Sequence, residues 1–469
     1  MENNLQVGFA RADITPRVCS VPLGGFGATE HRFSGCVADP LFVNAVALRS
    51  GEETLVYLSL DLLGIFGTMI DEIREAVAEK TGLPKNRIFA TASHTHSGPD
   101  PRSELPNAIK YRKEQFLPAL ADAAYRALND LLPAKLSHGS IETGIPGAPM
   151  NFDRHYYVVE REKLDSYTES DLELVGMTNP KFKQKGKYAY VGHWKKADPM
   201  MHILRFTREG ADDVMLVNFT AHATFVGKND SPLVSADWPG AFVQRLEEVF
   251  PNTKCAFLQG CAGNITPGTR IESEAFPGLT ITPGRDHNAY ASVLAGYALR
   301  LAQKDGFRDS ESTEIAVKQT MLRCTCDHSM DHLLPKAREA LKVFKKEGHT
   351  TAAKEYCHSF GFHSIYVCTG IEKHAALPEY EEIELNAIRI GDCAIATFPC
   401  EPFCSAGERV KEASPFAMTI ANGYACGYHS YVTSIEAPDD CYERLQMLYV
   451  PGTLEAMADK LAEMLNTMN

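Results

Sequence analysis

The chain has 469 residues, of which 44% are hydrophobic and 23% charged, and this composition is that of a globular protein with a sizeable core. Its formal net charge of −13, without a dense run of Lys and Arg, argues against nucleic acid and anionic membrane surfaces as partners. No window is apolar over the length needed to span a bilayer, so we expect no membrane insertion. The polar start lacks a secretion signal, and the 13 cysteines are odd in number and scattered, so we expect a reducing, cytoplasmic location.

A glycine-rich loop at residues 22–27 is the first distinctive feature of the chain. A phosphate cradle would need a helix directly behind the loop, and none is predicted there, so we interpret it as a tight structural loop. Residues 54–60 alternate and are rich in β-formers, which predicts a strand that ends at Asp61. A helix is predicted to follow at 68–80.

Two histidines follow the next predicted strand, residues 87–92, in the motif SHTHSGP at 93–99. If the extended geometry persists past residue 92, alternate side chains point the same way, and His94 and His96 converge. Two imidazoles at one strand end can share a metal ion, whereas the alternative is a polar loop whose histidines hydrogen-bond nearby backbone. Asp61 ends the preceding strand, so the layout is that of an α/β active-site edge, with Asp61 a candidate substrate-binding residue.

Residues from about 144 to 200 are rich in aromatic and charged side chains with weak periodicity. We expect an irregular insertion there, of the kind that forms a lid or a binding wall. Two strands are predicted after it, at 202–207 and 214–220, and the second leads to His222. A lone histidine in that position is either a metal ligand or a hydrogen-bonded core residue, and both readings stay open.

The other predicted elements alternate between helices and strands. Helices are predicted at 107–131, at 235–250 with Asp237 as N-cap, at 286–303, twice within 329–359, from 399, and at 452–465; strands are predicted at 254–258 and 417–422, with a hairpin at 382–398 that turns at 391–392. This order predicts an α/β protein with mixed β-sheets, flanking helices and an active site at strand ends. We expect one large domain over residues 1–469, and no pattern of a βα barrel is visible.

The histidines, Glu401 and the tyrosines of the loop after 417–422 all follow short apolar strands and sit among small residues. Two or three imidazoles with one carboxylate form a ligand set that suits zinc and leaves a position open for water or substrate. Such a site supports hydrolysis, because zinc activates water near neutral pH and polarises a carbonyl. The alternatives are a helix first-turn acid at Glu401 and tyrosines that only pack.

Five segments together resemble the neutral/alkaline (non-lysosomal) ceramidase family in its catalytic domain. They are RADIT at 11–15, SHTHSGP at 93–99, FTAH at 219–222, QGCAGN at 259–264 and YVTS at 431–434. The match extends from residue 11 to about 442, and its first histidine motif is the most specific. The resemblance implies a short, divergent member, and we expect no room for the additional carboxyl-terminal β-sandwich domain of the family.

The resemblance also implies roles for individual residues. In that family one zinc ion is held by residues that match His94, His222, Glu401 and Tyr431, although Tyr428 lies close enough in sequence to leave the tyrosine open. The residue that matches His96 positions the reacting carbonyl. We expect catalytic roles for His96, Thr266 and Tyr442, and substrate binding by Asp61, Asn264 and Tyr428.

Two departures from the family pattern concern the segment at residues 263–267. Ceramidases carry a serine in a Gly-Asp-x-Ser-Pro segment, whereas here Asn264 replaces the acid and Thr266 replaces the serine. Either Thr266 or water then attacks the substrate.

We therefore predict a zinc-dependent, ceramidase-like hydrolase of an amide or related acyl bond in a small molecule that is not a long-chain ceramide. The alternatives are an ester or lactone hydrolase of a polar metabolite and a metal-containing binding protein without catalysis. A binuclear hydrolase would need an acid such as Asp61 or Asp237 to bridge a second ion. The oligomeric state stays open, and a homo-oligomer is compatible with the sequence.

Overall fold

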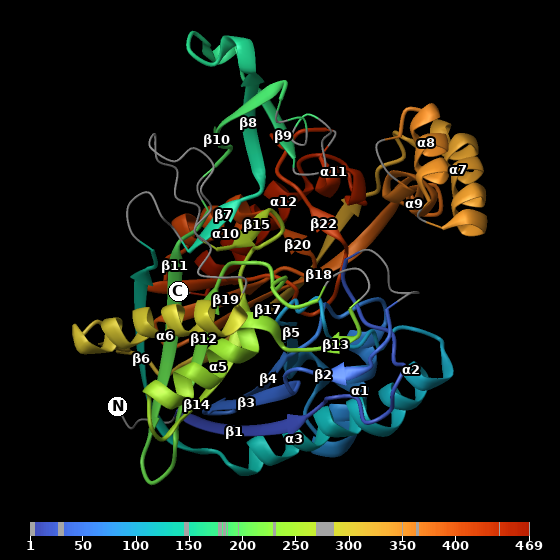
Figure 1. Cartoon of the computed structure of the whole chain (residues 1–469). Helices are drawn as coiled ribbons and strands as arrows, with labels where there is room; N and C mark the ends of the chain where they lie inside the picture. The colour runs from blue at the N-terminus through green and yellow to red at the C-terminus, as the bar shows by residue number, and fades with distance from the viewer. Residues whose placement is uncertain are drawn as a thin grey trace.

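Two β-sheets and the helices that flank them form the body of the molecule (Figure 1). The structure is a computed structural model. It describes residues 5–26, 32–144, 150–176, 181, 184, 186–195, 197–227, 231–268, 286–348, 350–362, 365–439 and 441–468.

The larger sheet has nine strands and mixed direction. Its order is β14 (Thr253–Gln259), β12 (Asp213–Phe219), β11 (Met200–Arg208), β6 (Leu132–Glu142), β1 (Gln6–Asp13), β3 (Phe42–Ser50), β4 (Glu53–Leu60) and β5 (Ile88–Ala92), with β16 (Arg308–Asp309) paired on β6. The pairs β12–β14 and β4–β5 are parallel. Parallel strands end at the same edge, and the sequence-predicted site residues follow β5 and β12.

The second sheet has four strands, in the order β17 (Ile315–Thr325), β18 (Tyr380–Ile390), β19 (Cys393–Thr397) and β21 (Met418–Asn422). The predicted hairpin is confirmed, because β18 pairs antiparallel with β19 and only residues 391–392 separate them. The smaller paired strands are β2 (Cys36–Val37) with β13 (Leu233–Val234) and β20 (Glu401–Pro402) with β22 (Tyr431–Val432).

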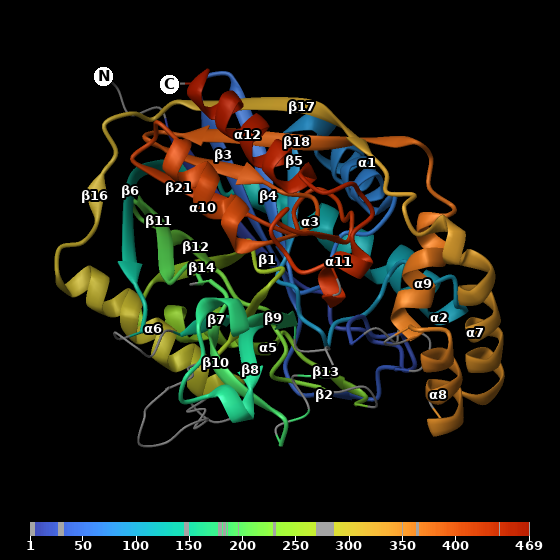
Figure 2. The ribbon, with the colours of Figure 1, turned by 90° about the horizontal axis from the view of Figure 1, so that it is seen from above.

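The two sheets pack face to face, and helices cover their outer faces, so that the body has four layers (Figure 2). The period-two alternation of the strands produces this arrangement. In β4, Val56 and Leu58 pack toward the helices, whereas Leu55 and Tyr57 pack toward the second sheet. Because both faces of such strands are buried, the strand reads as an almost continuous apolar run. The predicted mixed-sheet fold with flanking helices is confirmed.

Helices with apolar faces form the two outer layers. Those on the larger sheet are α1 (Met69–Thr81), α2 (Pro106–Tyr111), α3 (Leu117–Asn129), α5 (Asp237–Val249) and α6 (His287–Gln303), and those on the smaller sheet are α10 (Cys404–Ala413) and α12 (Thr453–Asn466). The single helix predicted at 107–131 is interrupted by a π-helical turn at Arg112–Phe116 between α2 and α3. No helix within the described ranges is long and apolar enough to cross a membrane.

The described part of the 144–200 stretch is more regular than predicted. It contains β7 (Asn151–Asp153), β8 (His155–Glu160), β9 (Glu173–Gly176) and β10 (Tyr188–His193). The last three form a small sheet that extends from the body (Figure 1), and β7 pairs with β15 (Ile265–Pro267). Short strands with interleaved charges give little periodicity, which explains the prediction of an irregular insertion.

Three helices form a lobe at the side of the body (Figure 1): α7 (Leu334–Glu347), α8 (Thr351–Ser359) and α9 (Ile365–His374). The first two were predicted, and α9 was not. A further short helix, α11 (Tyr442–Gln446), precedes α12 and contacts α9.

The prediction that Asp237 is the N-cap of α5 is wrong. Ala236 is the N-cap, and Asp237 is the first helical residue, with a left-handed φ of 54°. The carboxylate of Asp237 accepts hydrogen bonds from the backbone N–H groups of Val226, at 2.7 Å, and Trp238, at 2.6 Å. Asp237 therefore ties the loop after β12 to the start of α5.

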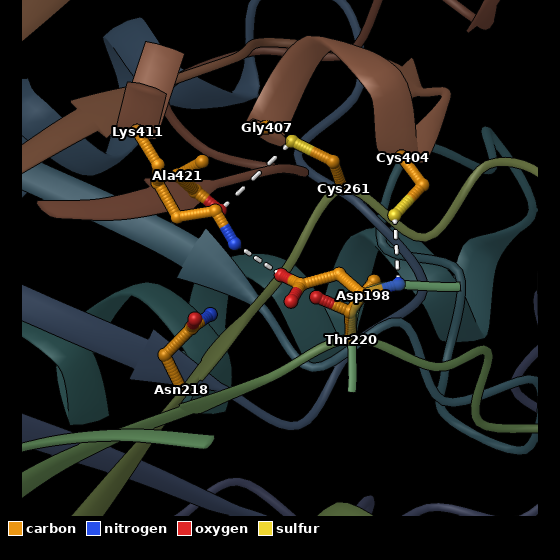
Figure 3. A pocket seen from close by; sticks show the side chains of 8 residues that line it. All are labelled: Asp198, Asn218, Thr220, Cys261, Cys404, Gly407, Lys411 and Ala421. Carbon is orange, nitrogen blue, oxygen red and sulfur yellow. Dashed lines mark hydrogen bonds and ion pairs between the residues drawn. The ribbon is translucent and has the colours of Figure 1, made fainter. Parts of the chain in front are cut away.

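A small enclosed pocket lies between α10 and the edge of the larger sheet (Figure 3). Its lining is Asp198, Asn218, Thr220, Cys261, Cys404, Gly407, Lys411 and Ala421. Lys411 is paired with Asp198, and the sulfur of Cys404 accepts a hydrogen bond from the Asp198 backbone N–H at 3.3 Å. None of the sequence-predicted site residues lines this pocket.

Candidate active site

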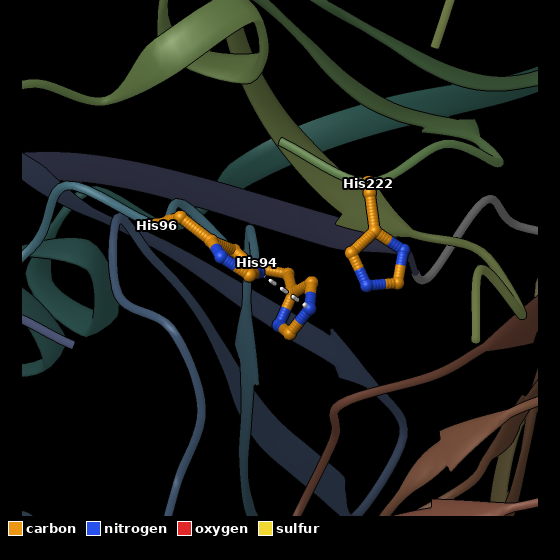
Figure 4. Close-up of side chains that lie close together, drawn as sticks. All are labelled: His94, His96 and His222. Atoms are coloured by element: carbon orange, nitrogen blue, oxygen red, sulfur yellow. Dashed lines mark hydrogen bonds between the residues drawn. The ribbon is translucent and has the colours of Figure 1, made fainter. Parts of the chain in front are cut away.

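Three histidines converge at the carboxyl ends of β5 and β12 (Figure 4). His94 and His96 come from the segment after β5, and His222 comes from the segment after β12. A parallel bridge between Thr95 and Ala223 joins the two segments. One nitrogen of each imidazole lies within 4.8 Å of the other two. The structure therefore brings together side chains whose convergence the sequence left open.

The backbone route to this convergence differs from the prediction. Strand β5 ends at Ala92, and His94 has a left-handed φ of 64°, so the extended geometry does not persist. A non-glycine residue in this region is uncommon and marks a locally strained backbone. The turn nevertheless brings the Nε2 atoms of His94 and His96 to 3.3 Å from each other.

His94 and His222 have the same hydrogen-bonding arrangement. The Nδ1 of His94 lies 2.7 Å from the Leu63 carbonyl oxygen, and the Nδ1 of His222 lies 2.6 Å from that of Ala262. A carbonyl only accepts, so each Nδ1 carries the hydrogen and each Nε2 has a lone pair; at His222, Arg154 Nη2 lies 3.0 Å from this atom. Metal-binding histidines commonly have a backbone carbonyl as this outer partner.

Glu401 completes this arrangement from β20, which pairs with β22 so that Glu401 and Tyr431 are register partners. The prediction that a helix begins at this segment is wrong, because α10 begins at Cys404. Glu401 Oε2 lies 3.2 Å from His94 Nε2 and 3.4 Å from His222 Nε2. It is buried and has no hydrogen-bond partner among the described residues.

Three donor–donor distances in this cluster match those around a tetrahedral metal ion. Ligands about 2.1 Å from zinc are ~3.4 Å apart in a tetrahedron. The two contacts of Glu401 have this length, and Tyr431 Oη lies 3.4 Å from His222 Nε2. A buried carboxylate oxygen without a hydrogen bond is costly unless a cation occupies the space beside it. These residues therefore have the spacing and chemistry of a metal-binding set.

His96 is oriented differently from the other two histidines. Its Nδ1 accepts a hydrogen bond from the Phe26 backbone N–H at 3.2 Å. Burial, with His94 and His222 nearby, lowers the pKa of His96 well below its usual range, so the ring is neutral near pH 7. The hydrogen of a neutral ring whose Nδ1 accepts is on Nε2. His96 thus presents an N–H group, not a lone pair, to the site.

The glycine-rich loop supports His96 directly. Gly25 has a φ of 92°, and a Cβ there would lie 2.6 Å from the His96 ring. Only glycine allows the backbone to approach the ring this closely. The described part of the loop, residues 22–26, thus holds a residue of the candidate site in place.

The tyrosines lie around the carboxylate and the histidines. Tyr428 donates a hydrogen bond to Glu401 Oε1, and Tyr431 lies beside His222 Nε2. Tyr442 begins α11 and packs its ring against Tyr431 with centroids 5.7 Å apart. Tyr424, another tyrosine of the loop after 417–422, stacks on His94 with centroids 4.1 Å apart, and its buried hydroxyl has no hydrogen-bond partner within the described part of the chain.

The remaining predicted residues lie at the edge of the cluster. Thr266 is in β15, next to Ile265, whose carbonyl accepts a hydrogen bond from the His222 backbone N–H. The Asn264 side chain bonds to Asp153 Oδ2, at 2.7 Å, and to the Cys404 backbone N–H, at 2.8 Å. Its amide thus joins β7 to the start of α10.

The acids considered for a second metal ion have other partners. Asp61 accepts a hydrogen bond from the Phe42 backbone N–H at 2.9 Å, and Asp237 binds backbone N–H groups at the start of α5. The described contacts of both carboxylates are with backbone groups and not with the histidines. The loop that follows Asp61 contributes the carbonyl of Leu63 to the site instead.

Asp61 gives the folded protein a defined pH dependence. Burial raises the pKa of Asp61 from 3.8 to about 7, although Phe42 and Arg11 lower it in part. The folded state therefore holds a proton that the unfolded chain releases above pH 3.8, so this residue reduces stability as pH rises toward 7. Asp61→Asn is expected to remove this loss. Urea unfolding at pH 5 and pH 8 gives the free energy of unfolding of both proteins. Between pH 5 and pH 8, the stability of the variant relative to the wild type should rise by a few kcal/mol. A constant difference between the two proteins would contradict this.

Two residues at the site were missed by the sequence analysis. Arg154 Nη2 lies 2.6 Å from the Gly263 carbonyl oxygen and 3.0 Å from His222 Nε2, and Nη1 lies 3.3 Å from Glu443 Oε1. Glu443 is the second residue of α11. Arg154 belongs to the stretch interpreted as an irregular insertion, and nothing in the sequence near it points to Glu443.

The fold and this centre define a class: a two-sheet α/β protein with a histidine and carboxylate cluster at its strand ends. The chain matches no protein-family model. It aligns with neutral ceramidase of Pseudomonas aeruginosa at 24% identity, over 97% of this chain and 71% of that protein.

The solved structures agree with that alignment. The crystal structure of neutral ceramidase from Pseudomonas aeruginosa has a TM-score of 0.68 and 18% identity, over the whole of this chain and 75% of that one. A structure of ceramidase complexed with C2 has a TM-score of 0.68 and 19% identity, over 100% of this chain and 75% of that one. The chain is a homologue of neutral ceramidase, as its motifs predicted, and this homology supports a hydrolase.

Proposed function

We propose that the chain is a metal-dependent hydrolase that cleaves an amide or a related acyl bond. The observation that carries the proposal is the convergence of Nε2 of His94, Nε2 of His222 and the unpartnered Oε2 of Glu401, which lies 3.2 and 3.4 Å from the two nitrogens. Three separate segments supply these buried donors. The homology to neutral ceramidase, whose name denotes cleavage of ceramide, supports an amide as the scissile group.

His94, His222, Glu401 and Tyr431 would hold the metal, which we propose to be one zinc ion per chain. Bound zinc acts as a Lewis acid on a carbonyl and activates water near neutral pH. The contact of Tyr431 with His222 Nε2 supports Tyr431 as the fourth donor. Tyr428, which donates to Glu401 Oε1, then orients the carboxylate so that Oε2 faces the histidines.

The other residues of the site polarise the substrate or support the residues that do so. His96 Nε2–H donates to the carbonyl oxygen of the scissile bond as negative charge develops on it. Arg154 adds a positive charge beside His222, and Tyr442 supports Tyr431 through ring packing. Thr266 and Asn264 shape the loop under His222, while the attack is made by water. Asp61 supports this edge of the sheet.

A small, polar acyl compound is the substrate that we propose. Charged and hydroxyl-bearing side chains support this choice, because Arg154, His96, Tyr424 and the other tyrosines surround the donor atoms. An ester or lactone of similar size is the alternative, since the same groups would polarise its carbonyl.

Metal analysis of purified protein and a hydrolysis screen test this function together. We expect one zinc per chain, loss of turnover on chelation and its return with zinc. The screen pairs amides with the matching esters and varies the acyl chain from acetyl to palmitoyl. Turnover of esters alone would favour the alternative, and preference for palmitoyl amides would restore a ceramide-like substrate. Protein without stoichiometric transition metal would overturn the proposal, and metal without turnover of any compound would indicate a binding protein.

A further inference from the structure

A buried chain of charged side chains lies behind His222 and ends at Arg154. Asp153 Oδ1 lies 2.8 Å from His155 Nδ1, and His155 Nε2 lies 3.2 Å from Glu443 Oε2. The second oxygen of Glu443, Oε1, lies 3.3 Å from Arg154 Nη1. The four side chains are between 0% and 11% exposed, so solvent screens their interactions little.

The contacts close into a ring. Asp153 Oδ2 accepts a hydrogen bond from Asn264 Nδ2, and the carbonyl of the adjacent Gly263 accepts one from Arg154 Nη2. The ring thus connects β7 and β8, the loop before β15, and α11. Arg154 contacts a proposed metal ligand through the imidazole of His222.

Both nitrogens of His155 face carboxylates, which accept hydrogen bonds but do not donate them when ionised. The imidazole of His155 is therefore protonated on both nitrogens, as an imidazolium ion. Burial would lower the pKa of His155, but Glu443 and Asp153 raise it well above its usual value. Burial would likewise raise the pKa of Glu443, yet Arg154 and His155 lower it to about 2. Two positive and two negative groups thus balance inside the protein.

A second metal ion is the competing explanation, because His155, Cys441 and Glu443 place donor atoms within 4.8 Å of one another. These donors are already partnered, however. Cys441 Sγ accepts a hydrogen bond from the Arg444 backbone N–H at 3.4 Å, and His155 and Glu443 bind each other. Glu401 Oε2 at the histidine cluster has no such partner among the described residues. The ring of contacts is therefore complete without an ion.

We propose that His155 is a positioning residue, which shares Glu443 with Arg154 and so holds the guanidinium beside His222 with its charge directed to the substrate. The role of the guanidinium rests on the proposed function, whereas the charged ring of contacts does not. Without the imidazolium, Glu443 would be free to pair with Arg154 through both oxygens. That bidentate pair would draw Arg154 away from Gly263 and neutralise it.

Two substitutions of His155 separate charge from shape. His155→Gln keeps hydrogen-bonding groups and removes the charge, whereas His155→Lys keeps the charge and changes the shape. His202→Gln is the matched control, because His202 is a buried histidine on β11 that bonds to Ser140 and lies outside this ring of contacts. We expect kcat/KM to fall ~10- to 100-fold in the Gln variant with metal content unchanged, most of it to return in the Lys variant, and the control to stay within about twofold. Equal losses in the Gln and Lys variants would overturn the role of charge.

The wild-type protein supplies a test that does not depend on activity. In 15N-histidine NMR, His155 should show two protonated ring nitrogens with similar shifts at pH 7.5, and the His155→Gln spectrum assigns the signal. A neutral tautomer would overturn the proposal even if the enzyme is active. If the wild type binds a second metal ion per chain and His155→Gln loses it, the positioning role of His155 would be wrong and a metal site at His155, Cys441 and Glu443 would replace it. Absence of turnover with a persistent imidazolium would contradict the proposed function and leave the ring of contacts in place.

Discussion

Replacement of Glu401 by Gln is expected to abolish stoichiometric metal binding and to lower kcat/KM by ~1,000-fold or more, equivalent to roughly 4 kcal/mol. Gln has nearly the same shape, but it is neutral and cannot supply the anionic Oε2 that faces His94 and His222. Metal per chain after dialysis, measured by mass spectrometry, and kcat/KM on the substrate found by the screen check this result.

Glu408→Gln is the matched control for this experiment. Glu408 is a partly buried glutamate on α10, only a few residues from Glu401, and no described contact joins it to the histidines. Its variant should keep both metal and activity. If Glu401→Gln retains one tightly bound metal ion per chain, Glu401 is not a ligand.

The second large effect is expected at His96, and it should leave the metal in place. His96→Ala removes the N–H group that we propose to face the reacting carbonyl, so kcat should fall ~100- to 1,000-fold, as for the loss of one oxyanion-hole donor. Metal content should stay at one per chain, because the lone pair of His96 is directed to the Phe26 N–H and not to the cluster.

His96→Gln serves as the conservative comparison. Its amide retains an N–H donor of similar reach, and part of the activity should return. If His96→Ala loses metal together with activity, the three histidines act as ligands together, which their mutual distance of 4.8 Å or less would permit.

Much of the fold follows from local patterns in the sequence. The apolar runs of β4 and β5 and the amphipathic faces of the helices predict elements whose bounds the structure matches closely, and the hairpin turn at residues 391–392 was predicted correctly. The small sheet of β8, β9 and β10 was missed, because its short strands carry charged residues among aromatic ones and lack a clear period. The π-helical turn between α2 and α3 also has no local pattern that distinguishes it from a continuous helix.

The candidate site was predictable in its residue types, and its geometry was not. The motif around His94 and His96 indicated a metal, yet the expected strand alternation is replaced by a left-handed residue at His94. The helix expected from residue 399 begins only at Cys404, and the two-residue strand at Glu401 has no local pattern because it is defined by its distant partner at Tyr431. The pairing of Arg154 with Glu443 likewise depends on tertiary contact, which sequence spacing does not encode.

The pairing of Glu401 with Tyr431 and the bridge between Thr95 and Ala223 have a consequence for the order of folding. The four proposed ligands lie far apart along the chain, so the site is assembled only after long loops have closed, which is slow and entropically costly. An ion that binds only the assembled site adds its binding free energy to the native state and not to the unfolded chain. The metal would then stabilise the native state mainly after the transition state for folding. Its removal should raise the unfolding rate more than it lowers the folding rate.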